Sequence, residues 1–332
     1  MSTDGGAARA LVSVVICAYN NWPDLEMTIE SALCQSYAPV EVIVVDNSST
    51  DATEHEVAER FGGRVRYIRQ ENRGDGGAYN TGFGAASGEL IQFVDGDDVL
   101  APNKIEKQVA IFEERPEVDI VYGDIRQFQT MAGIAAWKDV ATQPESDILM
   151  ELISPRRSWT GIGALGVLFR RRALETVGPW DESLYISDLD YWLRAAWAGC
   201  RFAHCPGSPM GFMRRRQGQM SANRAAMGRG LEAVWQKALG YVTREPYRGL
   251  LAEQLAEYRF RTAVARVGMR RREALDQLAL ARATSPAKVS APAYVFGYAT
   301  IVLPGGSFLV RSRWLQAIRR RLASLFRFRR FG

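Results

Sequence analysis

The stretch that decides the fold is Leu90-Ile91-Gln92-Phe93-Val94-Asp95-Gly96-Asp97-Asp98-Val99-Leu100. Its apolar first half is typical of a central strand buried on both faces of a sheet. The strand ends at three carboxylates, which repel one another unless a cation or hydrogen-bond donors compensate them. Ligands bind outside the carboxyl ends of such strands, and Mg²⁺ and Mn²⁺ prefer carboxylate and phosphate oxygens. A metal–diphosphate site and an acidic turn both remain open on this stretch alone.

Strands and helices alternate on the N-terminal side of this stretch. Apolar, β-branched runs predict buried strands, and helical spacing of apolar residues predicts the segments between them. The expected elements are strands at 11–19, 40–45 and 64–69, with helices at 24–37 and 53–61. This order predicts an α/β fold with a mostly parallel sheet flanked by helices. Tyr19, Asp46 and Asp95 then share one rim of the sheet, where they can converge on one ligand.

The chain continues with further regular elements and one stretch that matches no pattern. The expected elements are a helix at 105–115, a strand at 119–124, a helix at 187–198, and two or three amphipathic helices between 231 and 282. Helical spacing places Trp192 on the core-facing side of its helix. Residues 125–160, which include Trp159, are expected to be irregular and to line the acceptor side.

Other patterns exclude several classes of site. Residues 71–88 are rich in glycine, which permits close backbone approach, but they match neither a P-loop nor a dinucleotide-binding motif. The four cysteines have no paired spacing, so we expect reduced packing residues in a cytosolic protein rather than a zinc site. The polar N-terminus is too short for a secretory signal.

The basic charge of the chain is concentrated near its end. Residues 311–330 contain eight of the 42 Lys and Arg residues and no acid, which leaves 34 basic against 37 acidic residues elsewhere. Arginines on one face and apolar residues on the other predict a helix lying on an anionic membrane surface. A partner-binding helix is the alternative, and no nucleic-acid partner is expected. The apolar run 293–310 is interrupted by Pro304 and two glycines, so a spanning helix is not predicted.

A series of motifs resembles the family 2 glycosyltransferases of GT-A fold. In order these are Tyr19-Asn20, Val44-Val45-Asp46-Asn47-Ser48-Ser49-Thr50-Asp51, Asn72-Arg73-Gly74, Ala78-Tyr79-Asn80-Thr81-Gly82, Gly88-Glu89 and Asp95-Gly96-Asp97-Asp98. The resemblance spans residues 11 to about 105. It implies that Tyr19 stacks on the base of a nucleotide sugar and that Asp46 hydrogen-bonds the base, typically uracil. It also implies binding of the ribose–diphosphate and of Mn²⁺ or Mg²⁺ by Asp95 and Asp97.

Two later segments extend this resemblance. Ser187-Asp188-Leu189-Asp190-Tyr191-Trp192-Leu193-Arg194 is similar to the family helix that carries the catalytic base, which implies Asp188 in that role. On the pattern alone, a helix-capping role is favoured, with Ser187 or Asp188 as the N-cap residue, and only the resemblance favours a base. Phe212 to Ser221 resembles the Arg-Arg-His motif that closes over the diphosphate. Arg216 stands where histidine is usual, and arginine can contact a phosphate but cannot coordinate a metal. A solvated basic turn is the alternative.

These patterns together predict a metal-dependent, inverting glycosyltransferase. We expect a catalytic domain at 1–225, a helical extension at 226–290 and an apolar segment with a basic tail at 291–332. The assigned nucleotide-sugar site is Tyr19, Asp46, Asn72, Asn80, Asp95, Arg214 and Arg216; the metal ligands are Asp95 and Asp97; the base is Asp188; the acceptor side is Trp159 and Trp192.

The expected donor is a nucleoside-diphosphate sugar, a UDP-sugar first of all, and the acceptor is a saccharide or lipid-linked glycan of envelope polysaccharide assembly. The expected location is the inner face of the cell membrane. A sugar nucleotidyltransferase would need a glycine-rich loop after the first strand, which Cys17-Ala18-Tyr19-Asn20 lacks. A non-catalytic nucleotide-sugar-binding scaffold would keep Asp46 and Asp97 without needing Asp188.

Overall fold

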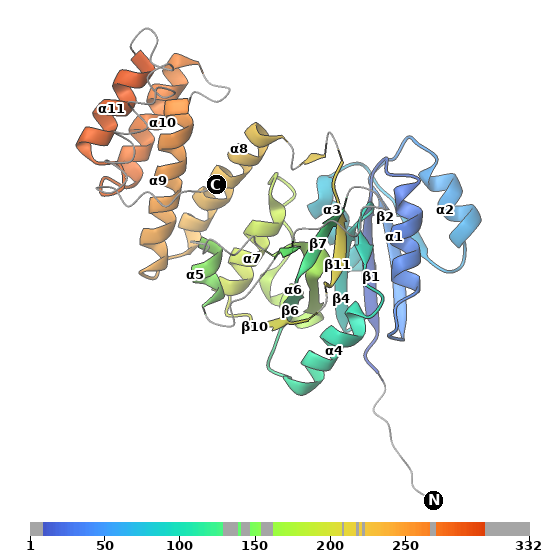
Figure 1. Cartoon of the computed structure of the whole chain (residues 1–332). Helices are drawn as coiled ribbons and strands as arrows, with labels where there is room; N and C mark the ends of the chain where they lie inside the picture. Colours follow the sequence, from blue (N-terminus) through green and yellow to red (C-terminus); the bar gives the residue numbers. More distant parts are fainter. Residues whose placement is uncertain are drawn as a thin grey trace, which may run out of the picture. The chain divides into compact units, whose positions relative to one another are not determined.

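The computed structural model describes residues 9–128, 139–140, 147–153, 162–207, 209–216, 219–220, 223–265 and 270–302. The chain divides into two compact units, Met1–Gln219 and Met220–Gly332. The first is an α/β unit, and the described part of the second is helical (Figure 1). Trp159, predicted for the acceptor side, and segment 311–330, predicted to bind a membrane surface, lie outside the described residues.

A seven-stranded sheet forms the centre of the first unit, in the order β10-β6-β9-β4-β1-β2-β3. Its strands are β1 Val12–Ala18, β2 Val40–Asp46, β3 Arg66–Arg69, β4 Leu90–Asp95, β6 Ile120–Gly123, β9 Val167–Arg170 and β10 Phe202–Cys205. Neighbours run parallel except β9, which is antiparallel to both β4 and β6. The predicted, mostly parallel α/β sheet is confirmed, with one reversed strand.

Helices flank this sheet, as the alternating pattern predicted (Figure 1). They are α1 Asp24–Leu33, α2 Thr53–Phe61, α3 Gly74–Ala85, α4 Lys104–Glu114, α5 Ile148–Ile153, α6 Arg171–Val177 and α7 Ser187–Trp197. Helix α3 was not predicted, because glycine is a poor helix former. At Gly82 a Cβ atom would overlap the Val15 side chain of β1, so glycine permits the close approach that the composition indicated.

A smaller sheet has the order β5-β11-β7-β8, with β5 Val99–Leu100, β7 Ile125–Phe128, β8 Asp139–Val140 and β11 Gly211–Arg214. The expectation that residues 125–160 are irregular is therefore wrong for β7, β8 and α5. Short strands of this kind lack a clear period-two pattern and are held by tertiary pairing. The pairing of β11 with β5 brings Arg214 beside the residues that follow β4.

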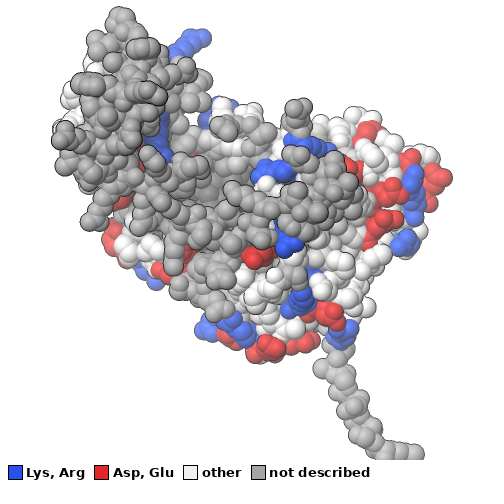
Figure 2. Space-filling view, in the orientation of Figure 1, with Lys and Arg blue, Asp and Glu red and all other residues white. Residues whose placement is uncertain are grey.

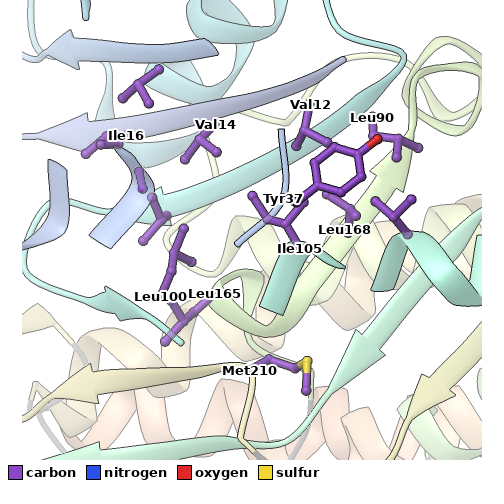
Figure 3. Close-up of a cluster of buried hydrophobic side chains, with 14 of the residues drawn as sticks. Val12, Val14, Ile16, Tyr37, Leu90, Leu100, Ile105, Leu165, Leu168 and Met210 are labelled. Carbon is purple, nitrogen blue, oxygen red and sulfur yellow. The ribbon is translucent and has the colours of Figure 1, made fainter. Parts of the chain in front are cut away.

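Alternate residues of β1 fill a core on one side of the large sheet. Val12, Val14 and Ile16 are fully buried there and point into a cluster that includes Ile105 of α4 and Leu168 of β9 (Figure 3). On β4, Phe93 instead joins a set of aromatic rings that contains Tyr79, Phe169, Trp180, Tyr191 and Trp192. Burial on both faces is the reason that these strands read as continuous apolar runs.

A buried polar network joins β4, α4 and the segment before β9. Lys104 is fully buried, and its Nζ lies within hydrogen-bond distance of the side-chain oxygens of Gln92 and Gln108 and of the Val167 carbonyl. Gln108 in turn donates to the Gly166 carbonyl at 2.8 Å. Burial lowers the pKa of Lys104 well below its ordinary value, which favours the neutral amine. This network holds the turn η2 (Ala164–Gly166) against the sheet.

The second unit consists of α8 Arg224–Tyr241, α9 Tyr247–Ala265, α10 Arg271–Thr284 and α11 Ala291–Val302 in its described part. The expectation of two or three helices between 231 and 282 is confirmed. Arg259 of α9 joins three of these helices by donating to Glu232 (2.8 Å), Gln236 (2.7 Å) and Thr284 (3.0 Å). Within the residues that the structure describes, no helix has the length and apolar character that crossing a membrane requires.

Acidic and basic side chains are intermixed on the surface of the first unit around α2 (Figure 2). Arg60 pairs there with Glu26 at 2.6 Å and with Glu56 at 2.7 Å. Surface pairs of this kind contribute little to stability, so this face is a solvated surface of mixed charge.

Candidate active site

The carboxyl ends of three adjacent strands form the predicted rim. Ala18 at the end of β1 pairs with Asp46 of β2, and Cys17 pairs on the other side with Asp95 of β4. Tyr19 follows β1 directly, and half of its surface is exposed. The structure therefore brings Tyr19, Asp46 and Asp95 to one edge of the sheet, which is where ligands bind in open α/β folds.

The carboxylates after β4 have different surroundings. Part of the surface of Asp95 is exposed, and its carboxylate accepts a hydrogen bond of 2.6 Å from the Tyr79 hydroxyl. Asp98 is only 4% exposed and accepts the backbone N–H of Arg214 at 2.9 Å. Loss of hydration and neighbouring negative charges raise the pKa of Asp95, Asp97 and Asp98. These carboxyls therefore hold protons more readily than ordinary aspartates until a cation neutralises the site.

A fourth carboxylate, Asp75, joins this cluster from the first turn of α3. Its Oδ1 lies 3.7 Å from the thiol of Cys17, and its charge raises the pKa of Asp95 and Asp188. Burial, followed by Asp75, raises the pKa of Cys17 and keeps it a thiol. Sequence reasoning missed Asp75; the signal was an acid within the Gly74-Asp75-Gly76-Gly77 run.

Helix α7 supplies Asp188 to the same cluster. The Oδ1 of Asp188 accepts the backbone N–H of Leu189 at 2.7 Å, whereas the N-cap position is Ile186, with no side-chain cap bond. Desolvation raises the pKa of Asp188, with a further contribution from Asp75. The charge of Asp188 also acts on Asp95, so the two carboxylates lie within electrostatic reach. Asp188 is therefore not the N-cap residue, although its carboxylate accepts an N–H of the first turn of α7.

Two arginines at the end of β11 meet the carboxylates that follow β4. Arg214 donates through Nε to the Asp97 carbonyl at 3.1 Å and pairs with Asp24 at 3.2 Å. Arg216 pairs with the Asp97 carboxylate at 2.9 Å and lies 3.7 Å from Asp24. The alternative of a solvated basic turn does not describe these contacts. Asp24, the first residue of α1, was not predicted as part of the site.

Asp46 is fully buried, and protein donors occupy both of its oxygens. They accept the backbone N–H of Ser49 (2.8 Å), the Tyr67 hydroxyl (2.5 Å) and the Arg69 guanidinium (2.9 Å). These bonds give Asp46 a role in fixing the loop after β2. Its hydrogen bond to a nucleotide base stays a prediction. Sequence reasoning missed Tyr67 and Arg69, because their strand shows no pattern that pairs them with Asp46.

Other assigned residues make structural contacts. Asn80 forms two hydrogen bonds with the backbone of Trp180, at 2.8 and 3.0 Å, and Asn72 accepts the N–H of Gly74 at 3.0 Å. Trp192 is 1% exposed and donates to the Ile162 carbonyl at 2.9 Å, which favours a packing role. Their parts in binding donor or acceptor stay predictions.

The carboxylate oxygens of Asp95 and Asp97 are suitable ligands for a hard divalent cation. Carboxylate oxygens are the ligands that Mg²⁺ and Mn²⁺ prefer. No three His, Cys, Asp or Glu side chains are arranged as a ready metal site within the described parts of the chain. A metal shared with a diphosphate needs only one or two carboxylates, since phosphate oxygens and waters complete its shell. Asp95 and Asp97 are sufficient for this arrangement.

The chain belongs to glycosyl transferase family 2, whose sequence model matches residues 13–178, half of the chain. The succinoglycan biosynthesis protein ExoO of Rhizobium meliloti is 35% identical over 201 residues, which cover 57% of this chain and 56% of ExoO. An uncharacterized glycosyltransferase of Nostoc sp. is 30% identical over 177 residues, covering 51% and 54%. The matched region spans little more than half of these relatives.

Solved structures show the same fold. TarS of S. aureus (1–349), in complex with UDP-GlcNAc, aligns with a TM-score of 0.62 and 17% identity over 90% of this chain and 91% of that chain. The mannosyltransferase PcManGT of Pyrobaculum calidifontis, in complex with GDP-Man and Mn²⁺, aligns with a TM-score of 0.57 and 19% identity, covering 96% and 83%. The predicted GT-A fold is confirmed.

We expect Asp46→Asn to lower the free energy of unfolding by about 1–3 kcal/mol, because it weakens a buried acceptor of three hydrogen bonds. Glu54→Gln is the matched control, since Glu54 also pairs with Arg69, at 3.1 Å, but is 62% exposed. It should cost less than about 0.5 kcal/mol. Urea denaturation measures the free energy of unfolding of both variants. Equal losses of this free energy in the two variants would contradict the anchoring role of Asp46.

Proposed function

We propose that the chain is an inverting glycosyltransferase that moves a sugar from a nucleoside-diphosphate sugar to an acceptor hydroxyl. The observation that supports the proposal is that Asp188 lies within electrostatic reach of Asp95, the residue at the carboxyl end of β4 that Asp97 follows two positions later. One carboxylate is available to accept a proton, and two are available to bind the donor. Membership of family 2 favours sugar transfer over nucleotidyl transfer.

The donor side follows from the residues of the rim. The exposed ring of Tyr19 offers a stacking surface for a base, and guanidinium groups such as those of Arg214 and Arg216 bind phosphate oxygens in pairs. A UDP-sugar is the first candidate, because the family resemblance implies uracil. TarS, with the same fold, has been solved with UDP-GlcNAc and with UDP.

Asp188 acts as the general base in this proposal. It removes the proton from the acceptor hydroxyl as that oxygen attacks the anomeric carbon from the side opposite the departing nucleotide. One displacement inverts the configuration at that carbon. Since burial raises the pKa of Asp188, the carboxylate is a better proton acceptor than an exposed aspartate. Only its deprotonated form works as a base, so the transfer rate is expected to rise with pH through that pKa.

Asp95 and Asp97 would hold a divalent metal in contact with the diphosphate of the donor. The metal, when bound, stabilises the negative charge that develops on the leaving diphosphate. Tyr79 fixes the Asp95 carboxylate through its 2.6 Å hydrogen bond, and Asp98 fixes the backbone of Arg214. PcManGT, which shares the fold, has been solved with Mn²⁺.

We place the reaction in the assembly of an envelope polysaccharide or related glycan, with a saccharide or lipid-linked acceptor. The support is the likeness to ExoO, which is named for succinoglycan biosynthesis.

The test is release of nucleoside diphosphate from a panel of UDP-, GDP- and dTDP-sugars, with Mn²⁺, with Mg²⁺ or with EDTA. We expect release from one donor, most readily a UDP-sugar, and a loss of about 10²-fold or more on removal of the metal. Stabilisation against heat by UDP and Mn²⁺ without release would point to a missing acceptor. If UDP and Mn²⁺ do not stabilise the chain against heat and no donor releases nucleoside diphosphate, the proposal is wrong.

We also propose that residues 311–330 bind an anionic membrane surface on the cytoplasmic side. Eight arginines without an acid supply the attraction, and Trp314, Leu315 and Ile318 supply apolar contacts. Such binding would keep the catalytic unit close to a lipid-linked acceptor.

Co-sedimentation with lipid vesicles tests this membrane contact. The full chain is expected to pellet with vesicles that contain phosphatidylglycerol and to stay in solution with phosphatidylcholine alone. Binding should weaken as salt rises, because the attraction is electrostatic. A chain lacking residues 311–332 is expected to lose the binding. Unchanged pelleting of that truncated chain would contradict the proposal.

A further inference from the structure

We propose that Arg216 serves as a resident cation at Asp97, so that the divalent metal and the guanidinium compete for one carboxylate. The geometry is the 2.9 Å pair between Arg216 Nη2 and Asp97 Oδ2. Asp97 is the residue assigned to the metal, and in this structure its carboxylate is already paired. This inference rests on the proposed function, because it concerns the metal–diphosphate site.

The two arginines of this segment are held differently. Arg214 is fixed: its backbone N–H bonds to Asp98, its Nε to the Asp97 carbonyl, and its guanidinium lies 4.6 Å from the centre of the Phe128 ring. Its side chain is 11% exposed. The side chain of Arg216 is 41% exposed, and it forms ion pairs with Asp97 and Asp24. Arg216 is therefore the member of the pair that can move.

Asp24 provides a second anchor for the moving group. Its Oδ1 pairs with Arg214 and its Oδ2 lies 3.7 Å from Arg216, so one carboxylate contacts both arginines. When Arg216 leaves Asp97 it stays within reach of Asp24 and of a diphosphate bound beside Asp97. The guanidinium then moves between fixed partners and is not lost to solvent.

Electrostatic repulsion prevents the divalent metal and the Arg216 guanidinium from binding Asp97 at the same time. The Asp97 side chain is 17% exposed, so solvent screens repulsion there less than at the open surface. A divalent ion and a guanidinium on the same carboxylate would repel each other strongly. The metal alone therefore has to displace Arg216 without replacing its partner. A donor diphosphate offers Arg216 new phosphate oxygens, so metal and nucleotide should bind with positive coupling.

Isothermal titration calorimetry on the full chain measures this coupling. The quantity is the dissociation constant of Mn²⁺, determined alone and in the presence of saturating UDP. For Arg216→Ala we expect Mn²⁺ alone to bind about 5- to 10-fold tighter than to the wild type. UDP should then lower the dissociation constant of Mn²⁺ by a smaller factor than it does in the wild type. Arg216→Lys keeps the positive charge on a different head group. Its dissociation constant for Mn²⁺ alone should lie between those of the wild type and of Arg216→Ala. Arg215→Ala removes the same charge one position away and should leave both constants within about twofold.

The outcomes separate this inference from the function on which it rests. If Arg216→Ala and Arg216→Lys bind Mn²⁺ alone no more tightly than the wild type, while UDP still promotes Mn²⁺ binding in all three, the competition is wrong and the metal site stands. If no variant binds Mn²⁺ even with UDP, the metal-dependent function fails together with the inference. Thermal melting of each variant confirms that it is folded.

Discussion

The crowding of carboxylates at the carboxyl end of β4 is the constraint on which the rest of the first unit depends. Asp95, Asp97 and Asp98 cannot all be ionised in close proximity without compensation, and Asp75 and Asp188 add to the repulsion. The fold supplies two kinds of compensation: protons, which the raised pKa values favour, and the guanidinium groups of Arg214 in β11 and of Arg216 just after it. A ligand that brings a divalent cation provides a third, and this is the physical reason to expect a nucleotide–metal complex here.

The arrangement of β11 shows how buried structure supports this balance. Gln92, Lys104 and Gln108 hold the backbone of residues 164–167 against the sheet. Leu165 in that turn packs so close to Gly211 that a Cβ atom there would lie 2.7 Å from the leucine Cγ. Glycine at the start of β11 therefore lets the strand approach the turn, and the strand then places Arg214 against Asp98. The polar network lies far from the surface, yet it positions the arginines of the site.

Much of this unit could be predicted from the sequence, for identifiable physical reasons. Continuous apolar runs predict buried strands such as β1 and β4. A carboxylate that follows such a strand has to lie at the edge of the sheet. The contacts between distant segments could not be predicted. Asp24 with Arg216, Tyr67 with Asp46, and Tyr79 with Asp95 each join residues whose proximity depends on the packing of different elements. Helix α3 was missed because its stability comes from packing against β1 rather than from helix propensity.

Separation of binding from turnover at Asp188 tests the account most directly. The measurement compares the affinity for UDP with Mn²⁺, and the rate of sugar transfer from the donor identified in the panel, in the wild type and in Asp188→Asn. In Asp188→Asn we predict an affinity unchanged within about threefold and a rate lower by about 10²- to 10⁴-fold, because the amide cannot accept the proton. The rise of the rate with pH should disappear in the variant. Transfer at the wild-type rate in Asp188→Asn would contradict the assignment of this carboxylate as the base.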